Sequence, residues 1–370
     1  AHMRPPRLHG RSLVNVIAEL EHRLTGSCQA PRLDLDLAEH IPDAATYVLV
    51  LFDGLGAHQL NHEQAGDLAA ANVATIDAPF PSTTTVSLSS IATGMTASQH
   101  GIIGYLMNLP DHGVVNMLKW TTPGGVPIEA DTSQLLPTPN LWERLKAAGI
   151  EPICVQPGNF ERTPLTRALY RGARYESVWN DADIVDATAQ LASEPGRLIF
   201  TYVPHVDVAA HVGGQKSDDY GRAVRTANSI WQTIANRLPE HAVMIGTADH
   251  GHLDYAEDHK LELPTEGLTI FGEPRAVYVK GVSEESPGIP SSLAPFPATW
   301  IPKDQLRAWL GNGPPHPELE RRLPDGVLLP DPGYLLLTSY MDNRLIGMHG
   351  GLEPGELEIP LLVARPTGRP

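Results

Sequence analysis

The chain has little cysteine, no excess of basic residues and no long hydrophobic run. Its two cysteines, Cys28 and Cys154, are too few for a disulfide scaffold and lack metal-motif spacing, so we expect a reducing, cytoplasmic setting. No stretch approaches the ~20 consecutive apolar residues of a membrane-spanning helix. Residues 1–3 are typical of a cloning remnant, and residues 4–10 lack the apolar segment of a secretory signal.

Negative charge dominates the composition. The chain carries 27 Lys and Arg against 43 Asp and Glu, a formal net charge of −16 at pH 7. This balance argues against a nucleic-acid polymer or an anionic membrane as partner. A small anionic substrate would need local positive charge, which bound metal ions can supply. With 42% hydrophobic and 19% charged residues, the chain has enough apolar material for a sizeable core.

Three continuous apolar, β-rich runs, at residues 47–52, 197–203 and 242–247, indicate strands buried on both faces of a parallel sheet. Amphipathic or capped segments between them indicate helices. We therefore expect an α/β fold in which a mostly parallel sheet lies between helical layers. Further expected strands are 152–155, 272–279 and 360–364, and the expected helices are 12–24, 59–71, 140–148, 181–192, 218–238 and 302–310.

Acidic residues and histidines follow each of the three buried runs. Asp53 comes directly after the first run, Asp207 and His211 stand four positions apart after the second, and Asp249-His250-Gly251 follows the third. Open α/β sheets bind ligands at the carboxyl ends of their strands, and Asp with His is a ligand combination that zinc accepts. The spacing of Asp207 and His211 places both on one face of a helical turn.

A hydroxyl-rich stretch, residues 80–94, offers a nucleophile. It begins as a turn with Ser82 and three successive threonines and continues as a helix of small residues. The free N–H groups and the positive dipole at a helix start favour a phosphate there. One threonine hydroxyl is therefore a candidate nucleophile.

Each feature alone also has a purely structural explanation. Hydroxyl residues before a helix commonly act as caps, and an acid followed by glycines, as at Asp53, is typical of a turn. An Asp and a His four apart occur on solvated helices. The late His349-Gly-Gly is equally typical of a loop. Only the combination points to a metal site.

The order of these motifs along the chain resembles that of the alkaline phosphatase superfamily, and within it that of the nucleotide pyrophosphatase/phosphodiesterase-like branch. The resemblance runs from about residue 47 to residue 364. The resemblance implies a three-layer α/β/α sandwich with a mostly parallel central sheet and an inserted cap-like segment. It implies one catalytic domain over residues 4–370. Within this domain, the Gly-, Pro- and Thr-rich residues 106–139 suit a substrate-facing loop or cap, and residues 253–345 a structured excursion between ligand motifs.

The resemblance also implies a site with two divalent metal ions, most simply Zn²⁺. Thr84 would be the nucleophile, because in the family it lies nine positions before the Thr of a Thr-Gly pair, here Thr93-Gly94; Thr83 is the reserve choice. One metal would be held by Asp53, Thr84, Asp249 and His250, and the other by Asp207, His211 and His349. The three carboxylates and a Thr84 alkoxide would balance the charge of two such ions, so that a phosphate can enter and form a phosphothreonine intermediate.

The chain departs from the family in the residue that contacts a phosphate oxygen. The phosphodiesterase branch usually has an Asn soon after the motif that is His100-Gly-Ile here, and Tyr105 or Asn108 would replace it as a substrate-binding residue. Phosphomonoesterases usually add an Arg near the nucleophile, and residues 80–104 contain none. This favours a small phosphodiester or nucleotide substrate and hydrolysis of phosphodiester or pyrophosphate bonds.

The alternatives are a phosphonoacetate-hydrolase-like or phosphomonoesterase activity, or a non-catalytic, metal-stabilised binding protein. The remaining conspicuous residues have simpler interpretations. His205 and His252 flank the ligand motifs, where a supporting or surface role is favoured over substrate contact. Trp120 and Tyr202 are expected to pack in the core rather than stack on a base.

Overall fold

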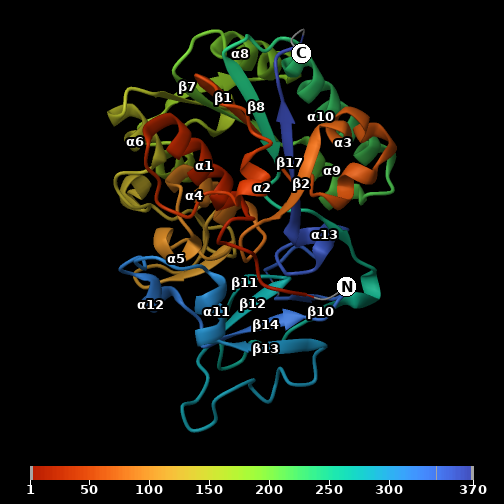
Figure 1. Ribbon diagram of the computed structural model, residues 1–370. Coiled ribbons are helices and arrows are strands. Elements are labelled where there is room, and N and C mark those ends of the chain that lie inside the picture. Colours follow the sequence, from red (N-terminus) through yellow and green to blue (C-terminus); the bar gives the residue numbers. More distant parts are fainter. Residues whose placement is uncertain (1–2, 339, 368–370) are drawn as a thin grey trace.

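The fold consists of a large layered unit and a second, smaller sheet. The structure, a computed structural model, describes residues 3–338 and 340–367. The large sheet lies between two layers of helices, and the smaller sheet lies below it in Figure 1. This confirms the expected α/β fold with a mostly parallel central sheet.

The large sheet has seven strands in the order β2-β17-β8-β1-β7-β5-β6. The strands β8, β1, β7, β5 and β6 are parallel neighbours, and β17 runs antiparallel to both β2 and β8. In sheet order the bounds are β2 Asn72–Asp77, β17 Glu358–Ala364, β8 Ala242–Thr247, β1 Thr46–Phe52, β7 Arg197–Val203, β5 Glu151–Pro157 and β6 Arg174–Val178.

The central strand β1 shows why the apolar runs form this sheet. All seven of its residues are buried. Because side chains alternate between faces, Tyr47, Leu49 and Leu51 enter one core and Val48, Val50 and Phe52 the other. A strand covered on both faces needs continuous apolar sequence, which is the pattern at residues 47–52.

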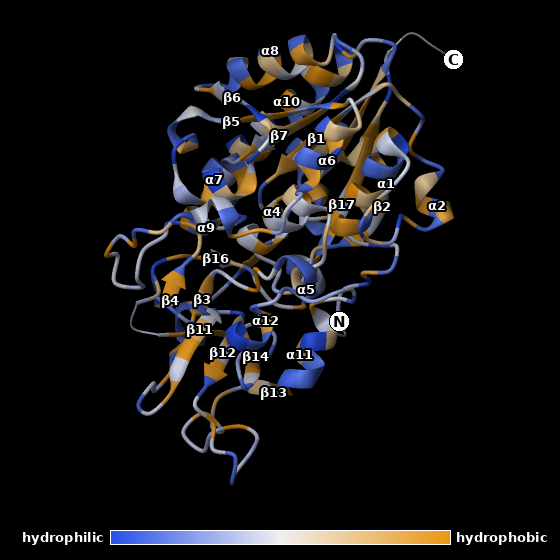
Figure 2. Ribbon diagram, turned by 90° about the vertical axis from the view of Figure 1, so that its left-hand side faces the viewer, coloured by the Kyte–Doolittle hydropathy of each residue, from blue (hydrophilic) through white to orange (hydrophobic). Residues whose placement is uncertain are grey.

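Helices cover both faces of this sheet, as the two views in Figures 1 and 2 show. One layer packs on the face of Leu49 and contains α1 Leu13–Thr25, α4 Thr84–Thr93, α6 Leu141–Ala147 and α7 Pro164–Leu169. The other packs on the face of Val50 and contains α3 Gly66–Ala71, α8 Asp181–Leu191, α9 His205–Gly213 and α10 Asp218–Asn236. The helix expected at residues 59–71 is wrong as a single element, because two short 3-10 turns, His58–Asn61 and Glu63–Ala65, precede α3.

The second sheet has six antiparallel strands in the order β13-β14-β12-β11-β3-β4. Its strands come from two separate parts of the chain, β3 Leu106–Leu109 and β4 Gly113–Asn116 from one, and β11 Thr269–Glu273, β12 Ala276–Lys280, β13 Ala298–Pro302 and β14 Gly326–Pro330 from the other. The strand expected at residues 272–279 is only partly right: residues 276–279 belong to β12, but residues 272 and 273 end β11, and the chain turns between Glu273 and Ala276, which pair with each other. Pro274, which has no N–H to donate, stands in that turn.

Shorter elements connect the two sheets. Strand β10 Lys260–Glu262 pairs with β15 Leu335–Leu337, and β9 Leu253–Asp254 with β16 Gly347–Met348. The remaining helices are α2 Leu35–Ala38, α5 Ala97–His100, α11 Lys303–Trp309, α12 Leu319–Arg322 and α13 Pro354–Leu357. Within the described ranges, no helix has the length and apolar character that crossing a bilayer requires.

Candidate metal centre

The acidic motifs meet at one edge of the large sheet. Strand β1 pairs in parallel register with β7 and β8, so the residues that follow the three strands emerge together. Asp53 follows β1 directly, Asp249 and His250 follow β8, and the chain after β7 turns into α9, which carries Asp207 and His211. The Gly54 N–H donates to Asp249 Oδ1 at 3.0 Å, which joins two of these strand ends.

Thr84 is the first residue of α4 and faces this cluster. Its hydroxyl donates to Asp249 Oδ2 at 2.9 Å and lies 3.2 Å from His250 Nε2. The neighbouring Thr85 donates to the carbonyl of Gly104 instead, at 3.1 Å. Thr83 lines the same cavity as Glu273, and its hydroxyl lowers the pKa of the Glu273 carboxyl. The three adjacent threonines therefore have different partners, and Thr84 is the one that contacts the acidic cluster.

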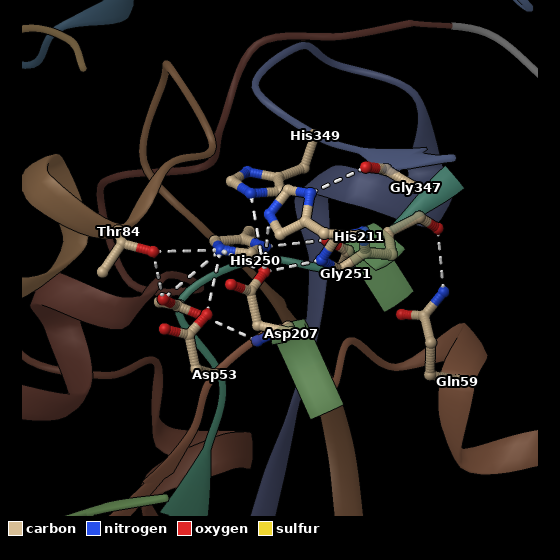
Figure 3. A network of polar contacts seen from close by, with 12 residues as sticks. Asp53, Gln59, Thr84, Asp207, His211, His250, Gly251, Gly347 and His349 are labelled. Carbon is tan, nitrogen blue, oxygen red and sulfur yellow. Dashed lines mark hydrogen bonds and ion pairs between the residues drawn. The ribbon is translucent and has the colours of Figure 1, made fainter. Parts of the chain in front are cut away.

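Two overlapping groups of side chains have the spacing of metal ligands. Asp53, Asp249 and His250 form one group, and Asp207, His250, His252 and His349 the other, with ligand atoms within 4.8 Å of one another in each. His211 adjoins the second group, since its Nε2 lies 3.2 Å from Asp207 Oδ1. Figure 3 shows Thr84, Asp53, Asp207, His211, His250 and His349 converging from separate segments of the chain.

Backbone carbonyls fix the orientation of three of these imidazoles. The Nδ1 atoms of His211, His250 and His349 lie 2.7 to 2.8 Å from the carbonyl oxygens of Gly347, Gly251 and Ser82, respectively. A carbonyl oxygen only accepts, so each Nδ1 must carry the hydrogen. The neutral rings therefore present the Nε2 lone pair to the cluster, the form in which histidine binds a metal.

The crowding of the cluster fits a cation. Asp207 Oδ1 has four imidazole nitrogens around it, at 2.6 Å from His252, 3.2 Å from His211, 3.7 Å from His349 and 3.8 Å from His250. The rings of His250 and His349 stack with centroids 3.3 Å apart. Asp53 Oδ1 is buried without a hydrogen-bond partner. Lone pairs gathered in this way are stabilised when a metal ion accepts them.

Burial and mutual repulsion shift the pKa values of the acids. Burial, together with the nearby Asp207, raises the pKa of Asp53 to about 8. Burial and the Asp53 charge also raise the pKa of Asp249 well above its usual value. For His211 burial acts in the opposite sense, but the Asp207 carboxylate raises its pKa to about 9. Without a cation, protons bound to these side chains reduce the repulsion between the buried carboxylates. A divalent ion can take the place of these protons.

Two supporting residues of the cluster have contacts that the sequence did not indicate. His252 is fully buried and its Nε2 lies 2.6 Å from Asp207 Oδ1, so it is not a surface residue. Its signal was present in the spacing of Asp249-His250-Gly-His252. Tyr202 packs against the core as expected, and it also donates its hydroxyl hydrogen to Asp53 Oδ2. His205 lies apart, with Nε2 2.6 Å from Asp181 Oδ1, and Trp120 is packed in the core as expected.

A cavity of about 400 Å³ opens beside Thr84. Tyr105 lines it, and the Tyr105 hydroxyl oxygen accepts a hydrogen bond from Asn116 Nδ2 at 2.6 Å, which leaves the hydroxyl hydrogen free to donate. Asn116 also lines the cavity and was missed from the sequence. Asn108, the other expected substrate contact, lies on β3 opposite Val114 and is not among the lining residues. The lining further includes Glu273, Asp207, His211 and His349.

A family model and several solved structures match this chain. Residues 47–352 match the family described as type I phosphodiesterase/nucleotide pyrophosphatase. No curated protein sequence matches the chain. Among solved structures, murine ectonucleotide pyrophosphatase/phosphodiesterase 5 superposes with a TM-score of 0.66 at 17% identity, covering 87% of this chain and 89% of the other. An inactive variant of that protein in complex with AMP gives the same TM-score and identity, covering 87% and 88%.

A second kind of solved enzyme shares the fold. Phosphonoacetate hydrolase from Sinorhizobium meliloti, in complex with phosphonoacetate, superposes with a TM-score of 0.62 at 15% identity, covering 87% of this chain and 91% of the other. At these identities the likeness to either protein shows a common fold.

Proposed function

Because this chain belongs to the type I phosphodiesterase/nucleotide pyrophosphatase family, we propose that it hydrolyses phosphodiester or pyrophosphate bonds of small, nucleotide-like substrates with Thr84 as the nucleophile. The observation that carries the proposal is the place of the Thr84 hydroxyl, at the start of α4 and within hydrogen-bonding distance of both Asp249 and His250. A hydroxyl at this position meets both a positive helix end and a cluster of metal-ligand atoms.

The residues that would hold two divalent cations are those of the two groups around His250. We propose that Asp53, Thr84, Asp249 and His250 hold one and that Asp207, His211 and His349 hold the other. When bound, the two ions, for which we propose Zn²⁺, would neutralise the buried carboxylates and lower the pKa of the Thr84 hydroxyl. This donor set is supported by the Nε2 lone pairs, which face the cluster, and by Asp53 Oδ1, which is buried without a hydrogen-bond partner.

The reaction of the protein's own groups has two displacements. In the first, Thr84 Oγ1 forms a bond to phosphorus while the bond to the leaving oxygen breaks, and that oxygen takes a proton from water. The hydrogen of Thr84 points at Asp249 Oδ2, so the proton has an acceptor at 2.9 Å. In the second, the hydroxide left by that water forms a bond to phosphorus while the bond between Thr84 Oγ1 and phosphorus breaks, and Thr84 Oγ1 takes back the proton from Asp249. Tyr105, which lines the same cavity, would donate its hydroxyl hydrogen to a phosphoryl oxygen.

The cavity lining favours a substrate with low charge at phosphorus. Among the described residues, Lys119 is the only Lys or Arg that lines the cavity, and the lining also contains Leu118, Met341, Leu345 and Met348. A phosphodiester carries one negative charge and needs less neutralisation than a monoester dianion. The cavity volume of about 400 Å³ suits a nucleotide-sized ligand, and AMP is the ligand of the structurally similar murine protein.

A second candidate is hydrolysis of a carboxylated phosphonate. The observation that favours it is Lys119, an exposed cation on the cavity wall that can pair with a second anionic group of the substrate. Phosphonoacetate, the ligand of the Sinorhizobium enzyme, carries such a carboxylate. A Lys119→Gln variant that loses turnover of phosphonoacetate but keeps turnover of a diester with uncharged leaving groups would support this candidate.

The partners and compartment follow from the same chemistry. We propose a small phosphodiester or nucleotide as the substrate, with no nucleic-acid polymer or membrane as partner, in line with the formal charge of −16. Both cysteines are free thiols in the structure, which is compatible with a reducing cytoplasm.

The test is hydrolysis of bis-p-nitrophenyl phosphate by the purified protein, before and after chelation and after addition of zinc. We expect turnover that chelation abolishes and zinc restores. Thr84→Ala should lose at least about 1,000-fold in kcat with zinc still bound, and Thr84→Ser, which keeps a hydroxyl, should retain measurable activity. Absence of turnover by the zinc-loaded wild type on diesters and nucleotides alike would refute the proposal.

A further inference from the structure

One buried acid on the cavity wall has no part in the metal groups. Glu273 ends β11, in the second sheet, and is 2% exposed. It lines the same cavity as Thr84 and Tyr105. Among the described residues, no Lys, Arg or His forms an ion pair with it. Burying an ionised carboxyl group without a cationic partner costs free energy, so the contacts of Glu273 need an explanation.

The Glu273 carboxyl touches three segments that build the site. Its Oε1 accepts a hydrogen bond from the Tyr105 N–H at 3.1 Å. Thr83, next to the nucleophile, lines the same cavity, and its hydroxyl lowers the pKa of the Glu273 carboxyl. Gly350, next to His349, is so close that a Cβ there would lie 2.6 Å from Glu273 Oε2. These three segments come from distant parts of the chain, and Glu273 stands where they meet.

We propose that Glu273 is a positioning residue for the reaction, whose carboxyl group holds the Thr83–Thr84 turn against the Tyr105 and His349 segments. The inference rests on the proposed function, because it assigns Glu273 a role in placing the Thr84 nucleophile. The second sheet then contributes to the reaction, because β11 carries Glu273, which positions the Thr83–Thr84 turn.

The surroundings of Glu273 favour its protonated form. Burial raises its pKa to about 8, and the Glu356 charge acts in the same direction, against the hydrogen bonds from Tyr105 and Thr83. The other titratable groups that it faces are the phenols of Tyr105 and Tyr278, which are neutral at pH 7. Neither Tyr105, whose N–H donates to this carboxyl, nor Thr83 is a candidate metal ligand. At pH 7 the group therefore adds no negative charge beside an anionic phosphoryl group.

A neutral acid predicts a specific order among substitutions. Glu273→Gln keeps the length, the planar shape and an acceptor oxygen, and it has the same charge as the proposed form. Glu273→Asp is shorter and cannot reach all three segments, and Glu273→Ala removes the contacts. Because a shift of about 1 Å in a reacting group can lower the rate about 100-fold, the Thr83–Thr84 turn should be sensitive to this loss.

The experiment measures kcat, KM and zinc content at pH 7 for wild type, Glu273→Gln, Glu273→Asp and Glu273→Ala, with bis-p-nitrophenyl phosphate as substrate. Glu320→Gln serves as the control, because Glu320 is an exposed acid outside the cavity, on α12, whose partners are Lys303 and Arg307. We expect Glu273→Ala and Glu273→Asp to lower kcat about 10- to 100-fold at unchanged zinc content. We expect Glu273→Gln and the control to stay within about threefold of wild type.

Each other outcome overturns the inference. A Glu273→Gln variant as impaired as Glu273→Ala would show that the negative charge is needed. Wild-type kcat in Glu273→Ala would show that the contacts do not place the nucleophile. Loss of zinc in Glu273→Ala would assign the residue to metal binding instead. A wild type without turnover would refute the proposed function, and this result is distinct from all three because it precedes any substitution.

Discussion

A fully buried ion pair connects the loops that carry two of the candidate metal ligands. The Arg275 guanidinium donates to Glu356 through Nε at 3.2 Å and through Nη2 at 2.8 Å, and Nη2 also donates to Glu353 at 2.8 Å. Glu356 Oε1 accepts the Gly351 N–H at 2.8 Å, and its backbone carbonyl accepts the Gly251 N–H at 2.7 Å. Glu356 thus holds the loops that follow both His250 and His349.

Replacing Glu356 by Gln leaves the Arg275 charge buried with a weaker partner. Removing one member of a buried ion pair costs about 3 to 5 kcal/mol. Glu353 is partly exposed but still pairs with Arg275 in the variant, so we expect a loss in the free energy of unfolding at the lower end of this range, about 3 kcal/mol. With an unfolding entropy of about 2.1 cal/mol/K per residue, this corresponds to a fall in Tm of roughly 4 °C for the 370-residue chain. Because the ligand loops loosen, zinc affinity should also fall about 10- to 100-fold.

A double-mutant cycle with thermal and urea unfolding tests this reasoning. Arg275→Met and Glu356→Gln should each destabilise the protein, and the double variant should be less destabilised than the sum, by at least about 1 kcal/mol. A competitive zinc titration of the same variants measures the loss of metal affinity. Strict additivity of the two changes, or an unaltered zinc affinity in Glu356→Gln, would refute the proposed connection.

Three further predictions concern single residues. Burial alone would raise the pKa of Asp77, but Arg4 and Arg7 hold it below its usual value. Asp77→Asn should therefore lower the free energy of unfolding in urea by about 2 kcal/mol at pH 7, and this difference should shrink as the pH falls below about 4. A difference that stays constant with pH would contradict the prediction. Gly350 has φ 137°, and a Cβ there would lie 2.6 Å from Glu273 Oε2, so Gly350→Ala should lower kcat at least about tenfold with a smaller effect on KM. Unchanged kinetics would count against this close contact between Gly350 and Glu273. Tyr105→Phe should lower kcat/KM for diesters about tenfold, a loss of about 1.4 kcal/mol, whereas an unchanged value would remove Tyr105 from substrate binding.

The sequence predicts the large sheet well because its strands are covered on both faces. Continuous apolar, β-rich runs at 47–52, 197–203 and 242–247 favour strands buried on both faces, and the structure has β1, β7 and β8 there. The acidic motifs follow these strands directly, so their convergence at one edge is a consequence of the parallel register.

The second sheet and the supporting residues were not predictable in the same way. The hairpin at residues 272–279 was interpreted as one strand, because the buried Arg275 next to Pro274 gives no clear periodic signal. Asn116 and Glu273 reach the cavity only because β3, β4 and β11 join in one sheet, which no local pattern reveals. The partners of Tyr202 and His252 likewise depend on neighbouring strand ends.

The most direct test of the central claim is to locate the covalent phosphoryl group. The zinc-loaded protein is mixed with a diester substrate, quenched in acid during turnover, and digested for mass spectrometry, with Thr84→Ala treated in parallel. The account predicts phosphorylation of Thr84, absent from Thr83 and Thr85, and no label in the variant. A label on another residue, or rapid turnover of substrate with no labelled protein at any quench time, would contradict it.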